Sequence, residues 1–258
     1  MVIAVVNSKG GVGKTTTSVN LAAALTMSGE RGRRVLLMDL DSQASASSWA
    51  GIKRSRLKPS SASCLLYDYP VLQAVRRTRT PQLDIITGSP ELANADVALC
   101  DRPGREAALK QLLAPLRDRY EIVVLDCPPG LSLLTVNALV AADALIVPIM
   151  ARYLVLHTIP DLLAAIHKVR TRLGSTPRLL GLLLMMVDGR RRADRATIQR
   201  LRGQYADRVF TTAIRFSHVF EEAAAAGQPV LAFAPRCGAT ACFRSLAVEV
   251  LQRSSARH

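Results

Sequence analysis

At 258 residues the chain lies in the range where a single α/β domain can bury a sizeable core, and we expect one domain over residues 1–258. Hydrophobic residues make up 49% of the sequence but aromatic residues only 4%, so the core must be built from aliphatic side chains. The longest apolar runs are too short to cross a bilayer, and the first residues form a strand pattern rather than a signal peptide. This excludes a transmembrane protein and predicts a cytoplasmic one.

The net charge is strongly positive, because 34 basic residues, most of them arginine, stand against 20 acidic ones. The excess of +14 favours a polyanionic partner, since neutralisation of phosphates supplies most sequence-independent DNA affinity. A solvated arginine-rich surface without such a partner is the alternative that charge alone leaves open. The five cysteines show no close metal-ligand spacing, and their odd number in a cytosolic chain indicates reduced thiols.

Short apolar runs alternate with longer stretches of helical periodicity along the chain. The predicted buried strands are 2–6, 35–38, 83–86, 122–125, 144–149 and 179–186, with 209–213 as a candidate seventh. The predicted helices are 15–28, 105–119, 133–141, 159–173, 193–205 and 217–226. This alternation predicts a three-layer α/β fold, in which a doubly wound, mostly parallel sheet has helices on both faces.

Two further segments complete the expected organisation. Residues 50–63 are rich in Ser, Lys and Arg, and we expect an exposed excursion there before the third strand. Near the carboxyl end, apolar residues recur at helical spacing, which predicts a closing helix packed on the sheet. These residues are Phe243, Leu246, Ala247, Val250 and Leu251.

A glycine-rich loop, Gly-Gly-Val-Gly-Lys-Thr-Thr, follows the first strand directly and opens a helix. Glycines let the backbone turn tightly and aim its amides at phosphate oxygens, while the helix N-terminus adds positive potential. Lys14 would hold the β and γ phosphates, and the Thr15 hydroxyl would coordinate Mg²⁺. The predicted nucleotide-binding residues are Gly10, Gly11, Val12, Gly13, Lys14, Thr15 and Thr16.

A second lysine, Lys9, stands immediately before the first glycine. Outside such a motif a solvated loop lysine would be the simplest interpretation. Here Lys-Gly-Gly-Val-Gly-Lys-Thr-Thr resembles the deviant Walker A motif of the ParA/MinD family of P-loop ATPases. The resemblance implies that the chain binds ATP and Mg²⁺ and forms a sandwich homodimer with ATP bound. It also implies that Lys9 reaches the phosphates of the other subunit's ATP, much as an arginine finger does.

The segment Asp39-Leu40-Asp41-Ser42-Gln43 follows the second strand and resembles the switch I segment of this family. The resemblance implies that Asp41 positions the attacking water, so that Lys9, Lys14 and Asp41 are the predicted catalytic residues. It places Asp39 near the magnesium shell. Taken alone, each aspartate could also be a turn residue or a helix cap.

The segment Asp126-Cys127-Pro128-Pro129 ends the fourth strand and resembles the Walker B and switch II segment. Asp126 is therefore expected to bind Mg²⁺ through water, because a carboxylate at the carboxyl end of a parallel strand faces the ligand crevice. The predicted metal site thus comprises Thr15, Asp39 and Asp126. Three motifs in the family's order weaken the interpretation of the aspartates as caps.

The similarity runs from residue 1 to about residue 250 and is nearest to small, stand-alone ParA proteins. It implies an ATP-bound dimer that binds nonspecific double-stranded DNA and is therefore associated with the nucleoid. A partner protein, ParB-like or a cargo adaptor, would stimulate slow ATP hydrolysis and release the dimer. The cargo would be a plasmid, a chromosome region or a protein assembly.

Arg190 matches a position used for DNA contact in these relatives, and further arginines follow it. Arg191 and Arg195 are four residues apart, so they share one helix face, which would contact phosphates rather than read bases. A solvated charged face is the alternative. Phe216 and Val219 stand where the family has basic residues, so the DNA surface is expected to be redrawn around residues 190–202. The candidate DNA-binding residues are Arg190, Arg191, Arg192, Arg195, Arg202 and Arg215.

Two rival functions stay open at this point. A MinD-like membrane ATPase for division-site placement needs a C-terminal amphipathic helix, but the apolar stripe of the tail is modest and favours a core position. A metal-cluster carrier would have to use Cys100 and Cys127, neither of which lies in a glycine-rich ligand loop. We expect Cys127 to be a small buried hydrophobe.

Overall fold

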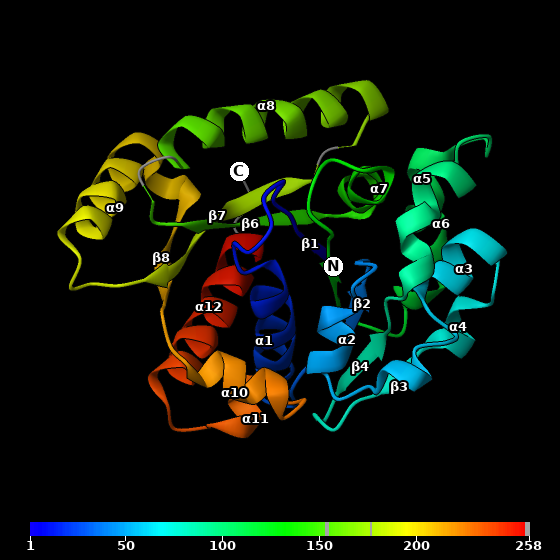
Figure 1. Ribbon diagram of the computed structural model, residues 1–258, viewed down its shortest axis with the longest axis horizontal. Coiled ribbons are helices and arrows are strands. Elements are labelled where there is room, and N and C mark those ends of the chain that lie inside the picture. Colours follow the sequence, from blue (N-terminus) through cyan, green and yellow to red (C-terminus); the bar gives the residue numbers. More distant parts are fainter. Residues whose placement is uncertain (153–154, 176, 256–258) are drawn as a thin grey trace.

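The protein is built on one eight-stranded sheet in the order β3-β4-β2-β5-β1-β6-β7-β8 (Figure 1). The computed structural model describes residues 1–152, 155–175 and 177–255. All neighbouring strands are parallel except β3, which runs antiparallel to β4. The strands are β1 (Val2–Val5), β2 (Val35–Asp39), β3 (Arg76–Arg77), β4 (Leu83–Ile86), β5 (Ile122–Asp126), β6 (Ala144–Met150), β7 (Arg178–Val187) and β8 (Val209–Arg215).

Two apolar cores lie on the two faces of this sheet. Successive side chains of a strand point to opposite faces, and in β1 Val2 and Ala4 belong to one core while Ile3 and Val5 belong to the other. Strands buried on both faces need near-continuous apolar sequences, which is what the runs in β1, β2 and β5 provide. The predicted three-layer, mostly parallel architecture is confirmed.

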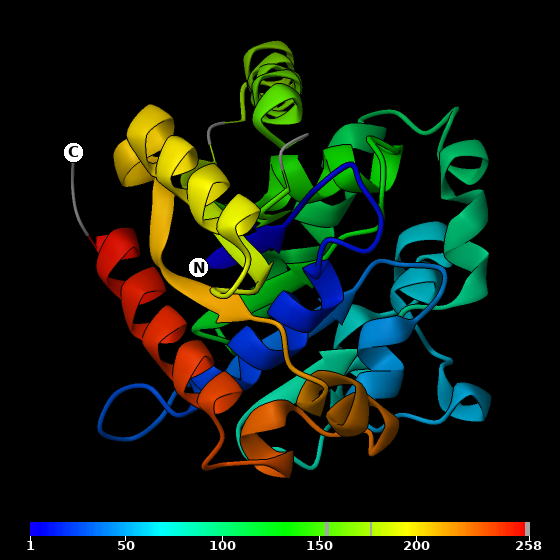
Figure 2. The same ribbon diagram turned by 60° about the vertical axis from the view of Figure 1, so that its left-hand side comes forward.

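Helices cover both faces, as Figures 1 and 2 show. Residues of α3, α6, α7, α8 and α9 enter one core, and residues of α1, α2, α10, α11 and α12 enter the other. The helices are α1 (Lys14–Thr26), α2 (Ser45–Trp49), α3 (Ser61–Tyr67), α4 (Val71–Ala74), α5 (Ala95–Ala98), α6 (Ala108–Leu113), α7 (Leu133–Ala141), α8 (Val155–Leu173), α9 (Arg192–Tyr205), α10 (Val219–Ala225), α11 (Val230–Phe233) and α12 (Gly238–Ser255).

The closing helix is confirmed as α12. Phe243, Leu246, Ala247 and Val250 are buried against the sheet, so the apolar stripe of the carboxyl end is part of the core rather than a membrane-facing surface. Among the described helices, none is long and apolar enough to cross a bilayer.

The sequence-based expectation was wrong at two places. The predicted helix over 105–119 is divided, because 3₁₀ turns at Arg105–Ala107 and Ala114–Leu116 flank α6, and Pro115 opens the second turn. The segment 50–63 is exposed only in its first part. Ser60 is buried and caps α3 by accepting from Ser63 N, and the Ser61 hydroxyl donates to Asp39 O at 2.7 Å. The serines are thus anchors of α3.

Candidate functional site

The carboxyl ends of β1, β5 and β2 bring the predicted motifs together at one edge of the sheet. β5 lies between β1 and β2, and the strand register pairs Val5 with Asp126 and Asp126 with Asp39. The loop from β1 to α1 crosses the same edge. Ligands of open parallel sheets bind outside the carboxyl ends of the strands, so this edge is the candidate site.

The glycines of the loop hold conformations that other residues adopt at a cost. Gly11 and Gly13 have φ of 71° and 92°, in the left-handed region. A Cβ at Gly13 would also come within 2.7 Å of Met185 Cε, whereas one at Gly10 or Gly11 would meet nothing within 4 Å. Gly13 therefore serves both the turn and the approach of the loop to β7.

Side-chain and backbone bonds anchor the loop to its neighbours. Asn7 Nδ2 donates to Pro148 O on β6 at 2.8 Å, and Asn7 Oδ1 accepts from Lys9 N at 3.0 Å. Gly130 N, after β5, donates to Ser8 O at 2.9 Å. The loop is thus fixed from both sides, and the Lys9 side chain is left exposed.

Lys14 opens α1 and is folded back over the loop. Its side chain is 7% exposed, and Nζ donates to Lys9 O at 2.7 Å. Burial lowers the pKa of Lys14, and the nearby Asp126 opposes that shift. The ammonium group is therefore held close to the loop amides, where an anion would meet both.

Asp126 is fully buried and accepts two hydroxyl hydrogen bonds from α1. Thr15 Oγ1 donates to Oδ2 at 2.9 Å, and Ser18 Oγ donates to Oδ1 at 2.8 Å. Burial, together with the neighbouring Asp39, raises the pKa of Asp126 above its ordinary value. Carboxylate and hydroxyl oxygens suit a hard divalent cation such as Mg²⁺. Sequence reasoning found Thr15 and missed Ser18, whose signal was its spacing of three residues on the same helix.

Asp39 is also fully buried, but its oxygens serve the chain itself. Oδ2 accepts from Ser47 N at 2.9 Å and from Ser47 Oγ at 2.7 Å, and Oδ1 accepts from Asp41 N at 3.0 Å. Burial raises the pKa of Asp39. Asp39 thus holds α2 and the segment that carries Asp41, a role for which Ser47 gave no recognisable sequence signal.

Asp41 lies half-buried at the same edge of the sheet. Its Oδ1 accepts from Gln43 N at 2.9 Å, which forms a local turn. Within the described residues no hydrogen bond uses Oδ2. One carboxylate oxygen of Asp41 is therefore available to a water molecule.

A small, largely apolar pocket of about 180 Å³ lies beside the loop. It adjoins Thr16 and is lined by Trp49, Met186, Phe216 and Phe220, among others. Trp49 belongs to α2, and its indole N–H donates to Gln228 O at 2.9 Å, which fixes the side chain in place. Sequence reasoning did not foresee this pocket, because its walls come from four distant segments.

The predicted arginines belong to α9, the loop before it and the end of β8, and Figure 2 shows the ribbons of these elements in yellow to orange. The side chains of Arg190, Arg192 and Arg215 are exposed and make no hydrogen bond or ion pair within the described part of the chain. The other three predicted arginines, although exposed, have partners. Arg195 Nη1 donates to Gly189 O and Arg190 O, Arg202 Nη2 donates to Thr211 O, and Arg191 pairs with Asp194 at 3.9 Å.

Two apolar residues predicted to lie on the DNA surface, Phe216 and Val219, differ in their exposure. Phe216 is 57% exposed and stands edge-on to His218, with ring centroids 5.0 Å apart, whereas Val219 is half-buried at the start of α10.

Both cysteines that a metal-cluster carrier would have to use are free thiols. Cys100 is exposed, Cys127 is buried with its pKa raised by burial, and the described residues hold no group of metal-binding side chains.

Comparison with known proteins gives the family. A family model described as an AAA domain matches residues 1–178. The sporulation initiation inhibitor protein Soj of Bacillus subtilis is 35% identical over 249 residues, covering 96% of this chain and 97% of Soj. The chromosome partitioning protein ParA of Caulobacter vibrioides is 35% identical over 258 residues, covering 99% of this chain and 96% of ParA.

Solved structures agree. The cobyrinic acid a,c-diamide synthase from Mycobacterium smegmatis with bound ADP and magnesium superposes with a TM-score of 0.84 at 33% identity, covering 99% of this chain and 96% of that one. The septum site-determining protein MinD of Pyrococcus horikoshii, complexed with Mg-ADP, has a TM-score of 0.79 at 24% identity over 98% of this chain and 97% of its own, and so shares the fold. On the matched family model, the identity along nearly the whole chain and the loop geometry, the chain belongs to the ParA/MinD family of P-loop ATPases.

Proposed function

We propose that the protein is an ATP-dependent switch that partitions or positions a cargo. In this proposal residues 1–258 act as one ATPase domain, which binds ATP and Mg²⁺, closes into a sandwich homodimer and binds nonspecific double-stranded DNA. Hydrolysis, slow until a partner protein stimulates it, releases the dimer from the nucleoid. The observation that carries the proposal is the convergence of Lys14, Thr15 and Asp126 under a glycine loop in the left-handed conformation.

The nucleotide-binding part of the proposal rests on the conformation of the glycine loop and on Lys14. Loop amides of residues 10–16 and the ammonium of Lys14 would bind the phosphates, and the pocket beside Thr16 offers apolar walls for a planar base. Thr15 and, through water, Asp126 would hold Mg²⁺, with Asp39 near the magnesium shell, where it also supports switch I. Bound Mg²⁺ supplies neutralisation of the charge that develops on the phosphate oxygens.

The proposed hydrolysis and dimerisation depend on Asp41 and Lys9, whose side chains are accessible at the loop edge. Asp41 has an oxygen free to orient water for attack on the γ phosphate. Lys9 is exposed beside the loop, while its own carbonyl accepts from Lys14. In a closed dimer the Lys9 ammonium would reach the partner's nucleotide and favour the ATP-bound state.

DNA binding is assigned to the exposed arginines. Arg190, Arg192 and Arg215 have no internal partner within the described residues and would contact phosphates directly. Arg191, Arg195 and Arg202 would contribute charge while they also hold the loop before α9 and the end of that helix in place. Two copies of this surface in a dimer would raise avidity without new contacts in either subunit.

The relatives support the proposed partner and cargo. Soj of Bacillus subtilis and ParA of Caulobacter vibrioides are named for sporulation control and chromosome partitioning, which supports a ParB-like partner or a cargo adaptor for this chain. The MinD-like alternative has less support, because the apolar stripe of α12 that would have to enter a membrane is buried in the core.

The test compares nucleotide states and one trapped variant. With Mg²⁺ and ATP the protein should sediment as a dimer and retain a nonspecific DNA duplex, and with ADP it should do neither. Asp41→Ala should still bind ATP, dimerise and stay on DNA, because only the water-positioning group is lost. Equal DNA retention with ADP and ATP would overturn the switch, and rapid hydrolysis by Asp41→Ala would overturn the role of Asp41.

A further inference from the structure

The outer side of β8 is a free sheet edge, since β8 is the last strand in the order of the sheet. Phe216 N donates to Val187 O on β7, so the N–H of Phe216 points inward. From Phe216 back to Ala213 successive residues turn their backbone groups to opposite sides, so Arg215 and Ala213 turn theirs outward. The register with β7 shifts between Val209 and Ala213, and in that irregular part Thr211 and Thr212 both direct their N–H groups to α12. Such outward N–H and C=O groups are a template for another strand unless something covers them.

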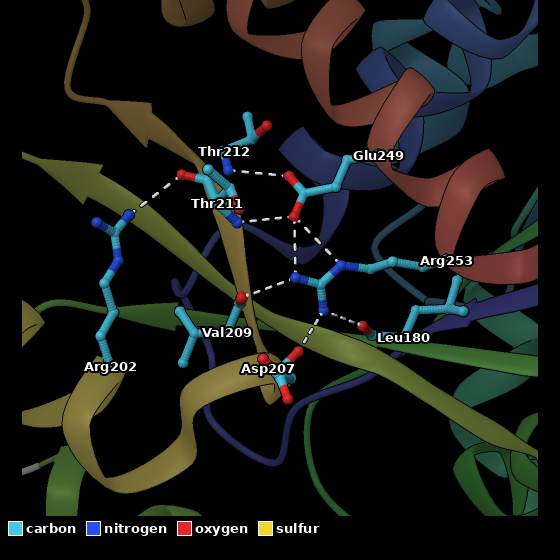
Figure 3. A network of polar contacts seen from close by, with 8 residues as sticks. All are labelled: Leu180, Arg202, Asp207, Val209, Thr211, Thr212, Glu249 and Arg253. Atoms are coloured by element: carbon cyan, nitrogen blue, oxygen red, sulfur yellow. Dashed lines mark hydrogen bonds and ion pairs between the residues drawn. The ribbon is translucent and has the colours of Figure 1, made fainter. Parts of the chain in front are cut away.

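The first half of this edge is covered by side chains (Figure 3). Glu249 on α12 accepts from Thr211 N at 2.7 Å and from Thr212 N at 2.9 Å, and Arg202 donates to Thr211 O at 3.1 Å. Arg253 pairs with Glu249 at 2.9 Å. Arg253 also donates to the carbonyl oxygens of Leu180, Asp207 and Val209. Side chains therefore provide hydrogen-bond partners for the backbone of this edge as far as Thr212 N.

The second half of the edge is open. Beyond the pairing with β7, the backbone groups of Ala213 and Arg215 make no hydrogen bond within the described residues. They border a groove of about 710 Å³ between β8 and the first turns of α12, within the range of roughly 300–1,000 Å³ for ligand clefts. The wall on α12 carries only small side chains: Gly238, Ala239, Ala241, Cys242 and Ser245. A backbone can approach β8 closely there.

The charge around the groove is positive and favours an acidic occupant. Arg215 lines it, and Arg236 and Arg244 flank its lining on α12 and the turn before it. All three side chains are exposed and without an ion pair among the described residues, and no lining residue is acidic. A second copy of this chain fits poorly, because pairing two β8 edges would bring two Arg215 side chains together. A DNA duplex would touch the arginines of the rim but leave the small-residue floor empty.

We propose that the open half of β8 is a docking edge for an extended, acidic segment of a partner protein. The segment adds as a strand beside Ala213 and Arg215, its alternate side chains lie over the small residues of α12, and its carboxylates meet the three arginines. The surface is distinct from the glycine loop and extends the proposed switch by a partner-binding site of defined chemistry.

The first experiment probes the backbone pairing with the unaltered protein. The probe is a fluorescein-labelled, end-blocked octapeptide of alternating valine and glutamate, followed by fluorescence anisotropy. It should bind, and the same peptide with lysine for glutamate should not. N-methylation of alternate residues in one register should weaken binding at least about tenfold, because the N–H donors toward β8 are lost, and in the other register by less than about twofold. Equal effects in both registers, or binding of the lysine peptide, would overturn the proposal.

The second experiment closes the groove. Ala241→Trp fills it, and Val248→Trp places the same ring on α12 at an exposed position outside the lining. Only Ala241→Trp should weaken peptide binding, by at least about tenfold. ATP hydrolysis and DNA retention should be unchanged in both variants, which keeps this result separate from that of the proposed switch. If Ala241→Trp weakened DNA retention as much as peptide binding, the groove would belong to the nucleic-acid surface and the proposal would be wrong.

Discussion

The glycine-loop edge and the arginine side of this molecule are built in opposite ways. At the loop, Lys14 and Asp126 are buried, and hydrogen bonds hold Lys14 to the loop and Asp126 to α1. On α9 and β8, the charged groups are exposed and some of them are tied to backbone carbonyls. Chemistry at a buried edge tolerates little change, whereas an exposed charged surface can change one residue at a time.

The largest expected effect lies at the loop. Lys14→Ala should weaken ATP binding by at least about 30-fold, because it removes one partner of a buried charged contact. Titration with a fluorescent ATP analogue measures this. Lys110→Ala, which removes an exposed lysine of α6, is the matched control and should bind as the unaltered protein does. Comparable ATP affinity in the two variants would mean that the buried Lys14 contributes no more to ATP binding than an exposed lysine does.

A smaller effect is expected from the loop backbone. Gly13→Ala forces a side chain into a left-handed conformation, which should lower the free energy of unfolding by about 1–2 kcal/mol. The contact with Met185 adds little, because the end of that side chain can move. Gly11→Ala, with a φ of 71° but open space around its Cβ, should be destabilised similarly, whereas Gly10→Ala, with open space and no positive φ, should not. Urea unfolding of the three variants would show whether conformation, rather than space, fixes the glycine.

The same contrast explains how far the sequence predicts this molecule. Apolar runs identify β1, β2 and β5, and the loop and strand-end aspartates follow because strand ends in a parallel sheet converge. The two-residue β3 carries too little periodicity to be recognised. Glu249 and Arg253, four apart on α12, have the spacing of a solvated pair. Only the position of β8 turns them into a cover for a sheet edge, and such long-range contacts leave no local pattern.

On the arginine side, the expected effect of a substitution depends on whether the arginine has a hydrogen-bond partner within the protein. Arg192→Ala removes a free cation, so DNA binding should weaken severalfold, and the slope of log affinity against log salt should fall by about one. Arg202→Ala should weaken DNA binding less than Arg192→Ala does. It should also lower the stability of the fold, because Thr211 O loses its donor. Arg54→Ala, an exposed arginine of another segment, is the control. Equal losses with all three variants would mean that net charge, not this surface, binds DNA.

The smallest effect concerns Glu249, which covers the edge of β8, and the size of this effect depends on pH. Burial raises the pKa of Glu249, but the N–H groups of Thr212 and Thr211 and the charge of Arg253 outweigh it, so the pKa lies below its ordinary value of 4.5. A depressed carboxyl pKa stabilises the fold above the ordinary value, and this contribution is lost as the pH falls through the folded pKa. Glu249→Gln should therefore cost about 1 kcal/mol at pH 7 and progressively less below pH 4.5. Urea unfolding at several pH values measures the difference, and Glu222→Gln, at an exposed position of α10, should show none. A difference that stayed constant with pH would mean that the shape of the side chain, not its charge, covers the edge of β8.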